Sequence, residues 1–401
     1  MYIIPALQLD GWLATERKHI GNQIIVKYEF RSTEPIKCRL CGGVMQRRGS
    51  RQLKVIDTPY NDLDVSLEIE TPIVYCPHCN HYGTVRPKAV HPSRRMTLRF
   101  MKLICQLMQE CSAAHLSKVL RVSESLILRA DKEVLNIIDK ACPVCMRGRR
   151  ALIIDEKYLG RKQKFITSVI DGDTGEVLWM RAGKGADSLK GFFASLTEEE
   201  KEGIEVVSVD RASAYTKAVR EYLPDAAISF DPFHIIKNVN DAITTVRKEA
   251  YRAAEAENKP LIKGKRFLLL RAEENLTPEQ QQSLDTLLKA NAPLNEAYIL
   301  KEQLRSLFQI SKFKEAALAF GKWIEMASSC SLASFRRIAK TLTANAQCVL
   351  NYFRFRLTSG RIEGFNSMIG RILFKARGVS SVEYIRLKIR ERTSPAFTRL
   401  I

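Results

Sequence analysis

The chain has 401 residues, of which 45% are hydrophobic, and it carries a formal net charge of +20. These values exclude one small domain and a wholly disordered chain, and they predict two to four domains. The basic excess is concentrated near the ends: residues 1–150 hold 24 basic and 14 acidic residues, and residues 351–401 hold 11 and 3. This concentration favours a polyanionic partner over an evenly solvated basic surface.

The composition also bears on the cellular compartment. The first twenty residues lack the pattern of a signal peptide, and no run of apolar residues is long enough to span a membrane. Most of the ten cysteines fall in CxxC pairs, which in an intracellular protein suit metal better than disulfides. We therefore expect a cytoplasmic protein with no membrane contact.

Residues 1–92 are predicted to form a zinc-ribbon DNA-binding domain. Cys38 and Cys41 form one CxxC turn, and Cys76 and Cys79 form another, so that four thiolates can hold one structural Zn²⁺. The sequence between them alternates apolar and polar residues around a turn at Pro59–Asn61, which indicates two strands. The alternatives are reduced, buried cysteines, or ligation by the neighbouring histidines, His78 and His81.

Residues 93–148 show helical spacing and are predicted to form a helix-turn-helix domain. Ser123 is a suitable N-cap for a recognition helix over 123–138. Its outward residues suit phosphates or base edges, and they are Ser125, Arg129 and Lys132. A plain three-helix bundle has the same spacing. A third pair, Cys142 and Cys145, lacks a visible partner pair, and zinc binding there stays open.

Residues 149–241 are predicted to form the first part of a ribonuclease-H-like α/β core, because three strands are followed by alternating helices and strands. The predicted strands cover 152–158, 164–170, 177–182, 205–209 and 227–230. Asp155 lies on the first strand and Asp210 ends the fourth, so the two are expected to be neighbours in the sheet. Asp171 and Asp173 belong to a hairpin turn.

Residues 242–356 are charged and helically periodic, and they are predicted to form an α-helical insertion domain. Thr277, Pro278 and Gln280 give a helix start signal. Trp323 is expected in the core, and stacking of this residue on an unpaired base is the weaker alternative. Residues 357–401 return to the core as its last helices. They place Glu363 and Asn366 three residues apart on one helix face.

Three carboxylates that converge from distant segments would offer oxygen ligands to hard divalent cations. Two such ions support in-line phosphoryl displacement without a covalent protein intermediate. We therefore expect Asp155, Asp210 and Glu363 to bind two Mg²⁺ ions, or Mn²⁺, and to act on nucleic acid.

The chain resembles the ISL3 family of insertion-sequence transposases, which have a DDE catalytic arrangement. The matching segments are "IIDEKYLGRKQKFITSVIDGDTGEVL", "VSVDRASAYTKAVREYLPDAAISFDPFHIIKNVNDA" and "TSGRIEGFNSMIGRILFKARGVSSVEYIRLKIR". The resemblance implies that Asp155, Asp210 and Glu363 are the catalytic triad. It also implies a bacterial protein that is associated with the nucleoid. Where it leads us to expect a lysine after Asn366, this chain has Gly370 followed by Arg371.

Further residues in these segments are candidates for accessory or DNA-binding roles. Asp231 and His234 are expected to be accessory site residues beside Asn366, although a structural strand-to-helix cap is the alternative for Asp231. The basic residues of the last segment that are expected to contact DNA are Arg361, Arg371 and Lys375.

The predicted function is that of a DNA transposase that binds terminal inverted repeats, cleaves strands with Mg²⁺ and transfers them to target DNA. Double-stranded DNA is the expected partner, and synapsis of two ends makes a homodimer the expected assembly. The alternatives are a non-catalytic zinc-ribbon and helix-turn-helix regulator, and a ribonuclease-H-fold nuclease. The regulator does not explain three aligned carboxylates.

Overall fold

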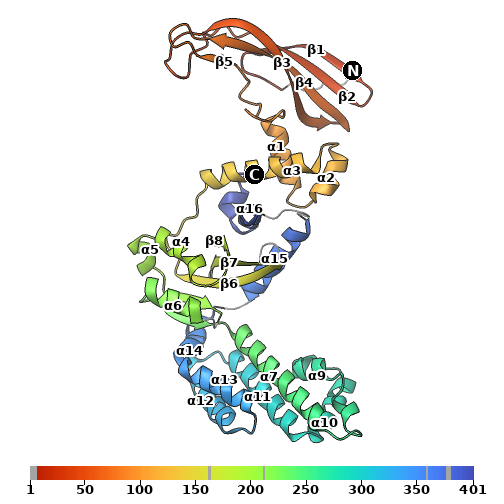
Figure 1. Cartoon of the computed structure of the whole chain (residues 1–401), viewed down its shortest axis with the longest axis vertical. Helices are drawn as coiled ribbons and strands as arrows, with labels where there is room; N and C mark the ends of the chain where they lie inside the picture. The colour runs from red at the N-terminus through yellow and green to blue at the C-terminus, as the bar shows by residue number, and fades with distance from the viewer. Residues whose placement is uncertain (1–6, 161–163, 211–212, 358–359, 376–380) are drawn as a thin grey trace. The chain divides into compact units, whose positions relative to one another are not determined.

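The computed structural model describes residues 7–160, 164–210, 213–357, 360–375 and 381–401, without the side chains of residues 164, 213 and 361–363. It is a mixed α/β protein with two sheets and many helices (Figure 1). The chain forms two compact units. The first comprises Met1–Pro143, Arg371–Val379 and Arg390–Ile401, and the second comprises Val144–Gly370 and Ser380–Ile389.

The first unit contains a five-stranded sheet with the order β1-β2-β4-β3, in which β5 also pairs with β4. Its strands are β1 (Trp12–Ile20), β2 (Gln23–Phe30), β3 (Gln46–Tyr60), β4 (Leu63–Tyr75) and β5 (Tyr82–Thr84). The β3–β4 hairpin confirms the two predicted strands. It turns at Asn61 and Asp62, whose φ angles are 46° and 62°, as a two-residue hairpin turn requires. The β1–β2 hairpin was not predicted.

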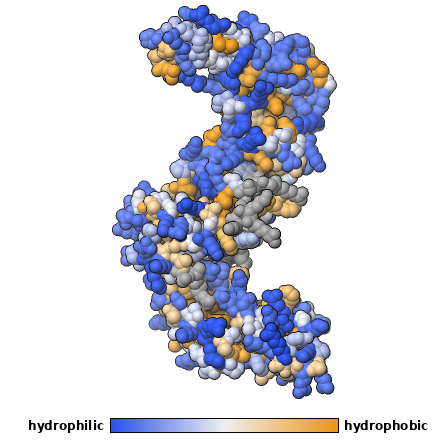
Figure 2. Space-filling view, viewed as in Figure 1, coloured by the Kyte–Doolittle hydropathy of each residue, from blue (hydrophilic) through white to orange (hydrophobic). Residues whose placement is uncertain are grey.

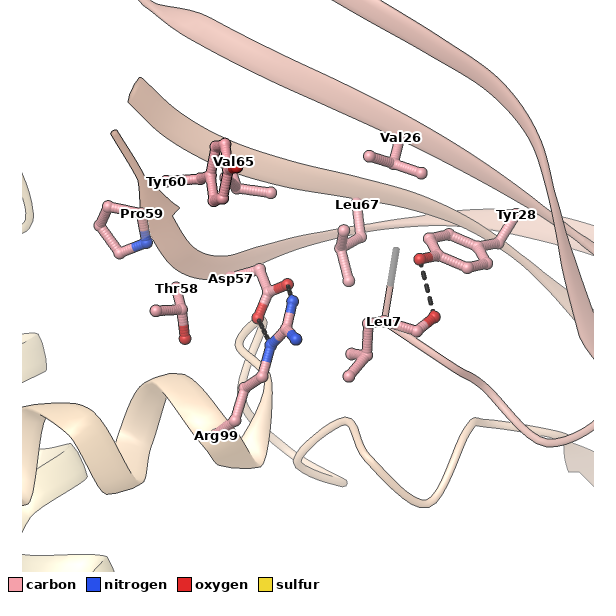
Figure 3. A pocket seen from close by; sticks show the side chains of 10 residues that line it. All are labelled: Leu7, Val26, Tyr28, Asp57, Thr58, Pro59, Tyr60, Val65, Leu67 and Arg99. Atoms are coloured by element: carbon pink, nitrogen blue, oxygen red, sulfur yellow. Dashed lines mark hydrogen bonds and ion pairs between the residues drawn. The ribbon is translucent and has the colours of Figure 1, made fainter. Parts of the chain in front are cut away.

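A small core lies on one face of this sheet, where alternate residues of β2, β3 and β4 are buried, including Val26, Val55 and Leu67. Beside this core, the buried carboxylate of Asp57 accepts a hydrogen bond from the Thr97 hydroxyl at 2.6 Å. It also accepts one from the Arg99 Nε at 2.8 Å (Figure 3). Asp57 and Arg99 line a cavity of about 140 Å³. The hydrogen bonds of Asp57 connect strand β3 to the start of the first helix.

Three helices follow, as the helical spacing predicts: α1 (Leu98–Leu107), α2 (Ala113–Val119) and α3 (Glu124–Ala141). Ser123 caps α3 by accepting a hydrogen bond from the Leu126 amide at 3.3 Å, which confirms the predicted N-cap. The turn between α2 and α3 contains Arg121 with a φ of 51°. The guanidinium of Arg121 also pairs with Asp64 at 2.9 Å, so the turn is fixed to the sheet.

The second unit contains a sheet with the order β10-β9-β6-β7-β8. Its strands are β6 (Ala151–Gly160), β7 (Lys164–Asp171), β8 (Val177–Ala182), β9 (Val206–Val209) and β10 (Ala227–Phe230). Strands β6, β9 and β10 are parallel, and β7 and β8 are antiparallel additions. The connections carry α4 (Asp187–Ser195), α5 (Glu198–Glu202) and α6 (Ser213–Tyr222). The predicted order of strands and helices is therefore present, with one additional short helix, α5.

The long segment after β10 is helical, as predicted, and Figure 1 shows its helices gathered together in green to blue. Its elements are α7 (Pro232–Ala253), α8 (Lys259–Ile262), α9 (Arg266–Leu270), η1 (Glu273–Asn275), α10 (Pro278–Lys289), α11 (Ala292–Gln309), α12 (Phe313–Ser329), α13 (Ala333–Ala344) and α14 (Ala346–Phe355). Thr277 and Gln280 form the predicted capping box at α10. Trp323 is 2% exposed and donates to the Leu300 carbonyl, which confirms its core position.

The chain ends with α15 (Gly360–Lys375), α16 (Val382–Thr393) and α17 (Pro395–Thr398). Among the described residues, none of the helices combines the length and the apolar composition that crossing a bilayer demands.

Candidate active site and metal centres

Three aspartates lie at the same level across the second sheet. In the parallel pairing of β6, β9 and β10, Ile154 lies opposite Val209, and Val209 lies opposite Phe230. The next residue of each strand is an aspartate: Asp155, Asp210 or Asp231. The carboxyl ends of parallel strands are where open α/β sheets bind ligands. The predicted proximity of Asp155 and Asp210 is therefore present, and Asp231 extends the row by one strand.

Asp231 and His234 connect this row to helix α7. One carboxylate oxygen of Asp231, Oδ1, accepts the Phe233 amide at 3.0 Å and caps the helix, with Pro232 at its first position. The His234 ring reaches both neighbouring aspartates: Nδ1 lies 3.5 Å from Asp210 Oδ1 and Nε2 lies 3.7 Å from Asp231 Oδ2. Asp231 is thus a helix cap, as the alternative interpretation held, and also faces the candidate site.

Helix α15 reaches the same place through Asn366. Its Nδ2 donates to Asp155 Oδ2 at 2.7 Å, and its backbone carbonyl accepts from the Lys157 ammonium. These two contacts fix α15 beside strand β6. Glu363 lies on α15 one turn before Asn366, but its side chain is outside the described residues. The predicted approach of the helix is present, and the position of the third carboxylate stays a prediction.

Burial makes two aspartates of the row, Asp155 and Asp231, electrostatically costly. Asp155 is 7% exposed and Asp231 is 3% exposed. Desolvation raises the pKa of Asp155, although the Asn366 amide opposes this shift, and desolvation likewise raises the pKa of Asp231. The negative charge of Asp210 adds to both shifts. A cation at this edge of the sheet would relieve that cost.

The four predicted cysteines of the first unit form a compact cluster. Cys38 Sγ lies 3.6 Å from Cys79 Sγ, Cys41 Sγ lies 3.5 Å from Cys76 Sγ, and all four sulfurs lie within 4.8 Å of one another. Four thiolates about 2.3 Å from a tetrahedral Zn²⁺ would be about 3.8 Å apart, so the spacing fits zinc. The structure thus confirms that the two CxxC pairs meet, as a zinc ribbon requires.

The two CxxC turns have the same backbone pattern. The amide of Gly42 donates to the Cys38 carbonyl and that of Asn80 to the Cys76 carbonyl, both at 2.9 Å. Gly42 and Asn80 have φ angles of 74° and 59°, which the turns require at these positions. The amides of Cys41 and Leu40 point at the Cys38 sulfur and lower the pKa of that thiol to about 7. The pKa of Cys76, the first cysteine of the second turn, is likewise lowered, whereas the pKa of the second cysteine of each turn, Cys41 or Cys79, is raised.

Two close groups of three or more potential metal ligands occur among the described residues: the four knuckle cysteines, and Cys105 with Asp131 and Glu391. Cys142, Cys145, His78 and His81 belong to neither group in this part of the chain. The three aspartates do not form a third group among the described residues, because their carboxylate oxygens do not all lie within 4.8 Å of one another. The sheet therefore aligns these side chains without bringing all of them to the spacing of ligands on one ion.

The residues predicted to contact DNA have different surroundings. Ser125 and Arg129 are exposed on α3, whereas Lys132 is half-buried there. Arg371 is exposed on α15, and the Lys375 ammonium donates to the Glu110 carbonyl at 2.8 Å. The side chain of Arg361 lies outside the described residues. Ser125, Arg129 and Arg371 are therefore the residues of this set that are open to a partner.

The segment that contains the aspartates matches the model of a known protein family. A family model described as a transposase, of the ISL3 type of DDE transposases, matches residues 152–389, which is more than half of the chain. The chain belongs to the ISL3 family of transposases.

Curated relatives agree with this assignment over most of their length. The chain is 27% identical over 357 residues to the transposase of insertion sequence element IS1001 from Bordetella parapertussis, covering 88% of this chain and 87% of that protein. It is also 27% identical over 380 residues to the transposase of IS1557 from Mycobacterium tuberculosis, covering 87% of this chain and 84% of that protein. The similarity thus includes segments outside the matched family region.

Sequence reasoning missed one residue of the candidate site, Lys157. Its ammonium contacts the Asn366 carbonyl, and desolvation lowers its pKa while Asp155 opposes that shift. The available signal was its spacing, because Lys157 is two residues after Asp155 and thus on the same face of a strand. Asp231 was considered only as an accessory residue, although its place in the row is equivalent to that of Asp155 and Asp210.

Proposed function

We propose that this transposase cleaves DNA strands at the ends of its insertion sequence and transfers them to target DNA, with Asp155, Asp210 and Glu363 as catalytic carboxylates on a ribonuclease-H-like core. The observation that carries this proposal is the row of aspartates directly after the paired residues Ile154, Val209 and Phe230. Helix α15 reaches Asp155 through Asn366 and brings Glu363 within one turn of the contact.

The described residues suit a hard divalent cation such as Mg²⁺ or Mn²⁺. Asp231 Oδ2 and Asn366 Oδ1 are both buried and have no hydrogen-bond partner within the described part of the chain. Buried oxygens without a donor are costly, and oxygen is the ligand that Mg²⁺ prefers. Asp155 and Asp210, with Glu363, would hold two ions. When bound, such ions stabilise the attacking and leaving oxygens of an in-line phosphoryl transfer.

The protein residues around the carboxylates would keep this arrangement in place. The Asn366 amide orients the Asp155 carboxylate, and the Lys157 ammonium fixes the backbone of Asn366. The His234 ring lies between Asp210 and Asp231, with one ring nitrogen within 4 Å of each carboxylate. Asp231 uses one oxygen as a helix cap, which directs the other toward the site.

The first unit would supply DNA recognition, with a structural Zn²⁺ at the four cysteines and helix α3 presenting Ser125 and Arg129. We further propose double-stranded DNA, both element ends and target, as the partner. A homodimer is the proposed assembly, because the two ends of an element must be joined in one complex.

Cleavage of DNA that contains the element's ends tests the proposal. With Mg²⁺ the wild-type protein is expected to release the 3′ end and join it to target DNA, and with EDTA it is expected to do neither. Asp155→Ala and Glu363→Ala are expected to reduce both products below detection. The matched control is Asp173→Ala, which removes an exposed carboxylate paired with Arg150 in the hairpin after β7.

Each rival function predicts a different result. A regulator would bind end DNA equally with and without Mg²⁺ and leave it intact. A nuclease would cleave without forming joined products. Cleavage that persists in Asp155→Ala would refute the catalytic assignment.

A further inference from the structure

The amino-terminal half of strand β3 has two exposed faces. All seven residues from Gln46 to Gln52 are exposed, whereas the second half of the strand contributes Leu53 and Val55 to the core. Hydrophobic packing therefore does not explain why the strand extends so far. Its charge is also one-sided, because residues 37–54 contain six basic and no acidic residues.

A bulge between Arg47 and Gly49 determines which side chains share a face. Arg47 lies opposite Val74 and pairs with Glu70 on that face. After the bulge, Gly49 and Arg51 lie opposite Ile73 and Thr71, on the other face. The guanidinium of Arg48 stacks over the Tyr75 ring, 5.3 Å from its centroid. Because Tyr75 alternates with Ile73 and Thr71, Arg48 and Arg51 share one face.

Two tyrosines complete this surface. Tyr82 of β5 lies directly opposite Tyr75 of β4, and their ring centroids are 4.8 Å apart. Tyr82 is 63% exposed, so most of its side chain is accessible to a partner. The Tyr75 hydroxyl donates to Asn80 Oδ1 at 2.6 Å, next to the second cysteine turn. We call the surface formed by Arg48, Arg51, Tyr75 and Tyr82 the Arg–Tyr patch.

We propose that the Arg–Tyr patch is a binding surface for the phosphate backbone of duplex DNA, separate from helix α3. The inference rests on the proposed function, since it needs a DNA substrate. A guanidinium group binds phosphate oxygens with two parallel hydrogen bonds. The contact with the Tyr75 ring holds the guanidinium of Arg48 in place before DNA binds. The tyrosine rings give an apolar surface for the deoxyribose.

An ordinary role for charged residues on this strand is protection of a sheet edge, because β3 is the last strand of its sheet. Edge protection requires charge, but it does not require two arginines on one face beside two tyrosines whose rings are in contact, one half-buried and one exposed. It also does not explain the absence of acidic residues over 37–54. These observations together point to a polyanionic partner.

The test compares two double variants of the full-length protein, Arg48→Gln/Arg51→Gln in the patch and Arg17→Gln/Lys18→Gln on exposed β1 of the same sheet. Binding to a labelled end-containing duplex is measured by fluorescence anisotropy between 50 and 300 mM salt. The patch variant is expected to bind about tenfold more weakly, and its plot of log affinity against log salt should lose a slope of about 1.8, since two phosphate contacts disappear. The β1 variant should keep the wild-type slope.

Further measurements distinguish the possible failures. The patch variant should lose affinity equally for an unrelated duplex of the same length, because phosphate contacts are independent of sequence. Arg48→Lys/Arg51→Lys should retain the wild-type slope, and Tyr82→Ala should weaken duplex binding with unchanged slope. Zinc content and thermal unfolding establish that each variant is folded.

Wild-type affinity in a folded patch variant, or equal losses in both double variants, would overturn the inference while leaving cleavage by the wild type intact. A loss confined to single-stranded DNA would overturn the duplex assignment. If the wild-type protein itself neither binds nor cleaves end DNA, the proposed function fails as well.

Discussion

The buried aspartates of the candidate site illustrate a conflict between stability and function. Asp155 and Asp231 are nearly inaccessible to water, and burial raises the pKa of each. A carboxyl group whose pKa is higher in the folded state binds its proton more tightly there than in the unfolded chain. Stability is therefore greatest below the unfolded pKa and is lost as the pH rises through the folded pKa.

Replacing one of these carboxylates should stabilise the metal-free protein. Asp231→Asn keeps the shape and the oxygen that caps α7, but it removes the buried charge. In EDTA at pH 7.5 the variant is expected to melt at a higher temperature than the wild type, with the difference disappearing in acid. Differential scanning fluorimetry over pH 4–8 measures this effect, and the exposed Asp225→Asn is the matched control.

Mg²⁺ should reverse the order of stability. Ligands stabilise the folded state by mass action, by about 2.7 kcal/mol at one hundred times the dissociation constant. The wild-type melting temperature is therefore expected to rise with Mg²⁺ more than that of Asp231→Asn. Equal metal responses would show that Asp231 does not contribute to the ion site.

At the scale of the element, the β7–β8 hairpin is held by one arginine. The Arg149 guanidinium pairs with Asp171 and Glu176 and donates to the Thr174 hydroxyl at 3.1 Å. Asp171 in turn accepts the amides of Asp173 and Thr174, which confirms the predicted hairpin turn. Because both carboxylates are largely buried, the stability of the hairpin depends on the positive charge of Arg149 that pairs with them.

Arg149→Met is expected to lower the free energy of unfolding by about 3–5 kcal/mol, because it leaves two buried carboxylates without the cation that pairs with them. Urea unfolding followed by circular dichroism measures the change. The neighbouring Arg150 is 54% exposed and pairs with Asp173, so Arg150→Met should cost less than about 1 kcal/mol. Similar losses in the two variants would contradict this account.

The elements themselves were largely predictable where one physical pattern dominated. The apolar runs before Asp155 and Asp210 indicated buried strands, and Ser123 and Thr277 indicated helix starts that the structure contains. The β1–β2 hairpin was not predicted, since strand pairing across the sheet decides its structure. Lys157 was missed because its role depends on a contact with Asn366, 209 residues away.

At the scale of the whole molecule, the sequence predicted which cysteines meet and that Asp155 and Asp210 are neighbours, but it did not predict that Asp231 lies in the same row. Two CxxC pairs carry their own turn geometry, so their assembly needs one long-range contact. Alignment of three aspartates requires a particular register in two strand pairs, which spacing along the chain does not specify. The boundaries of the five predicted segments stay predictions, while the compact units number two.

Loss of zinc should affect the first unit selectively. Cys76→Ser removes a buried ligand of the four-cysteine cluster and is expected to lower bound zinc by about tenfold or more and to lower the melting temperature of the first unit. Metal analysis and limited proteolysis of residues 7–92 measure these effects. The control is Cys111→Ser, a half-buried cysteine outside the cluster. Zinc content that is unchanged in Cys76→Ser would exclude the site.

The long helical segment leaves and rejoins the second sheet at a single strand. Helix α7 starts directly after β10, and α14 returns to the same strand, where Asn351 Nδ2 donates to the Ile228 carbonyl at 2.8 Å. The start and the end of the helical segment are thus both attached to strand β10. The helices between these two attachments can therefore change in length or sequence during evolution while the row of aspartates keeps its geometry. The helical segment is thus free to specialise independently of the candidate site.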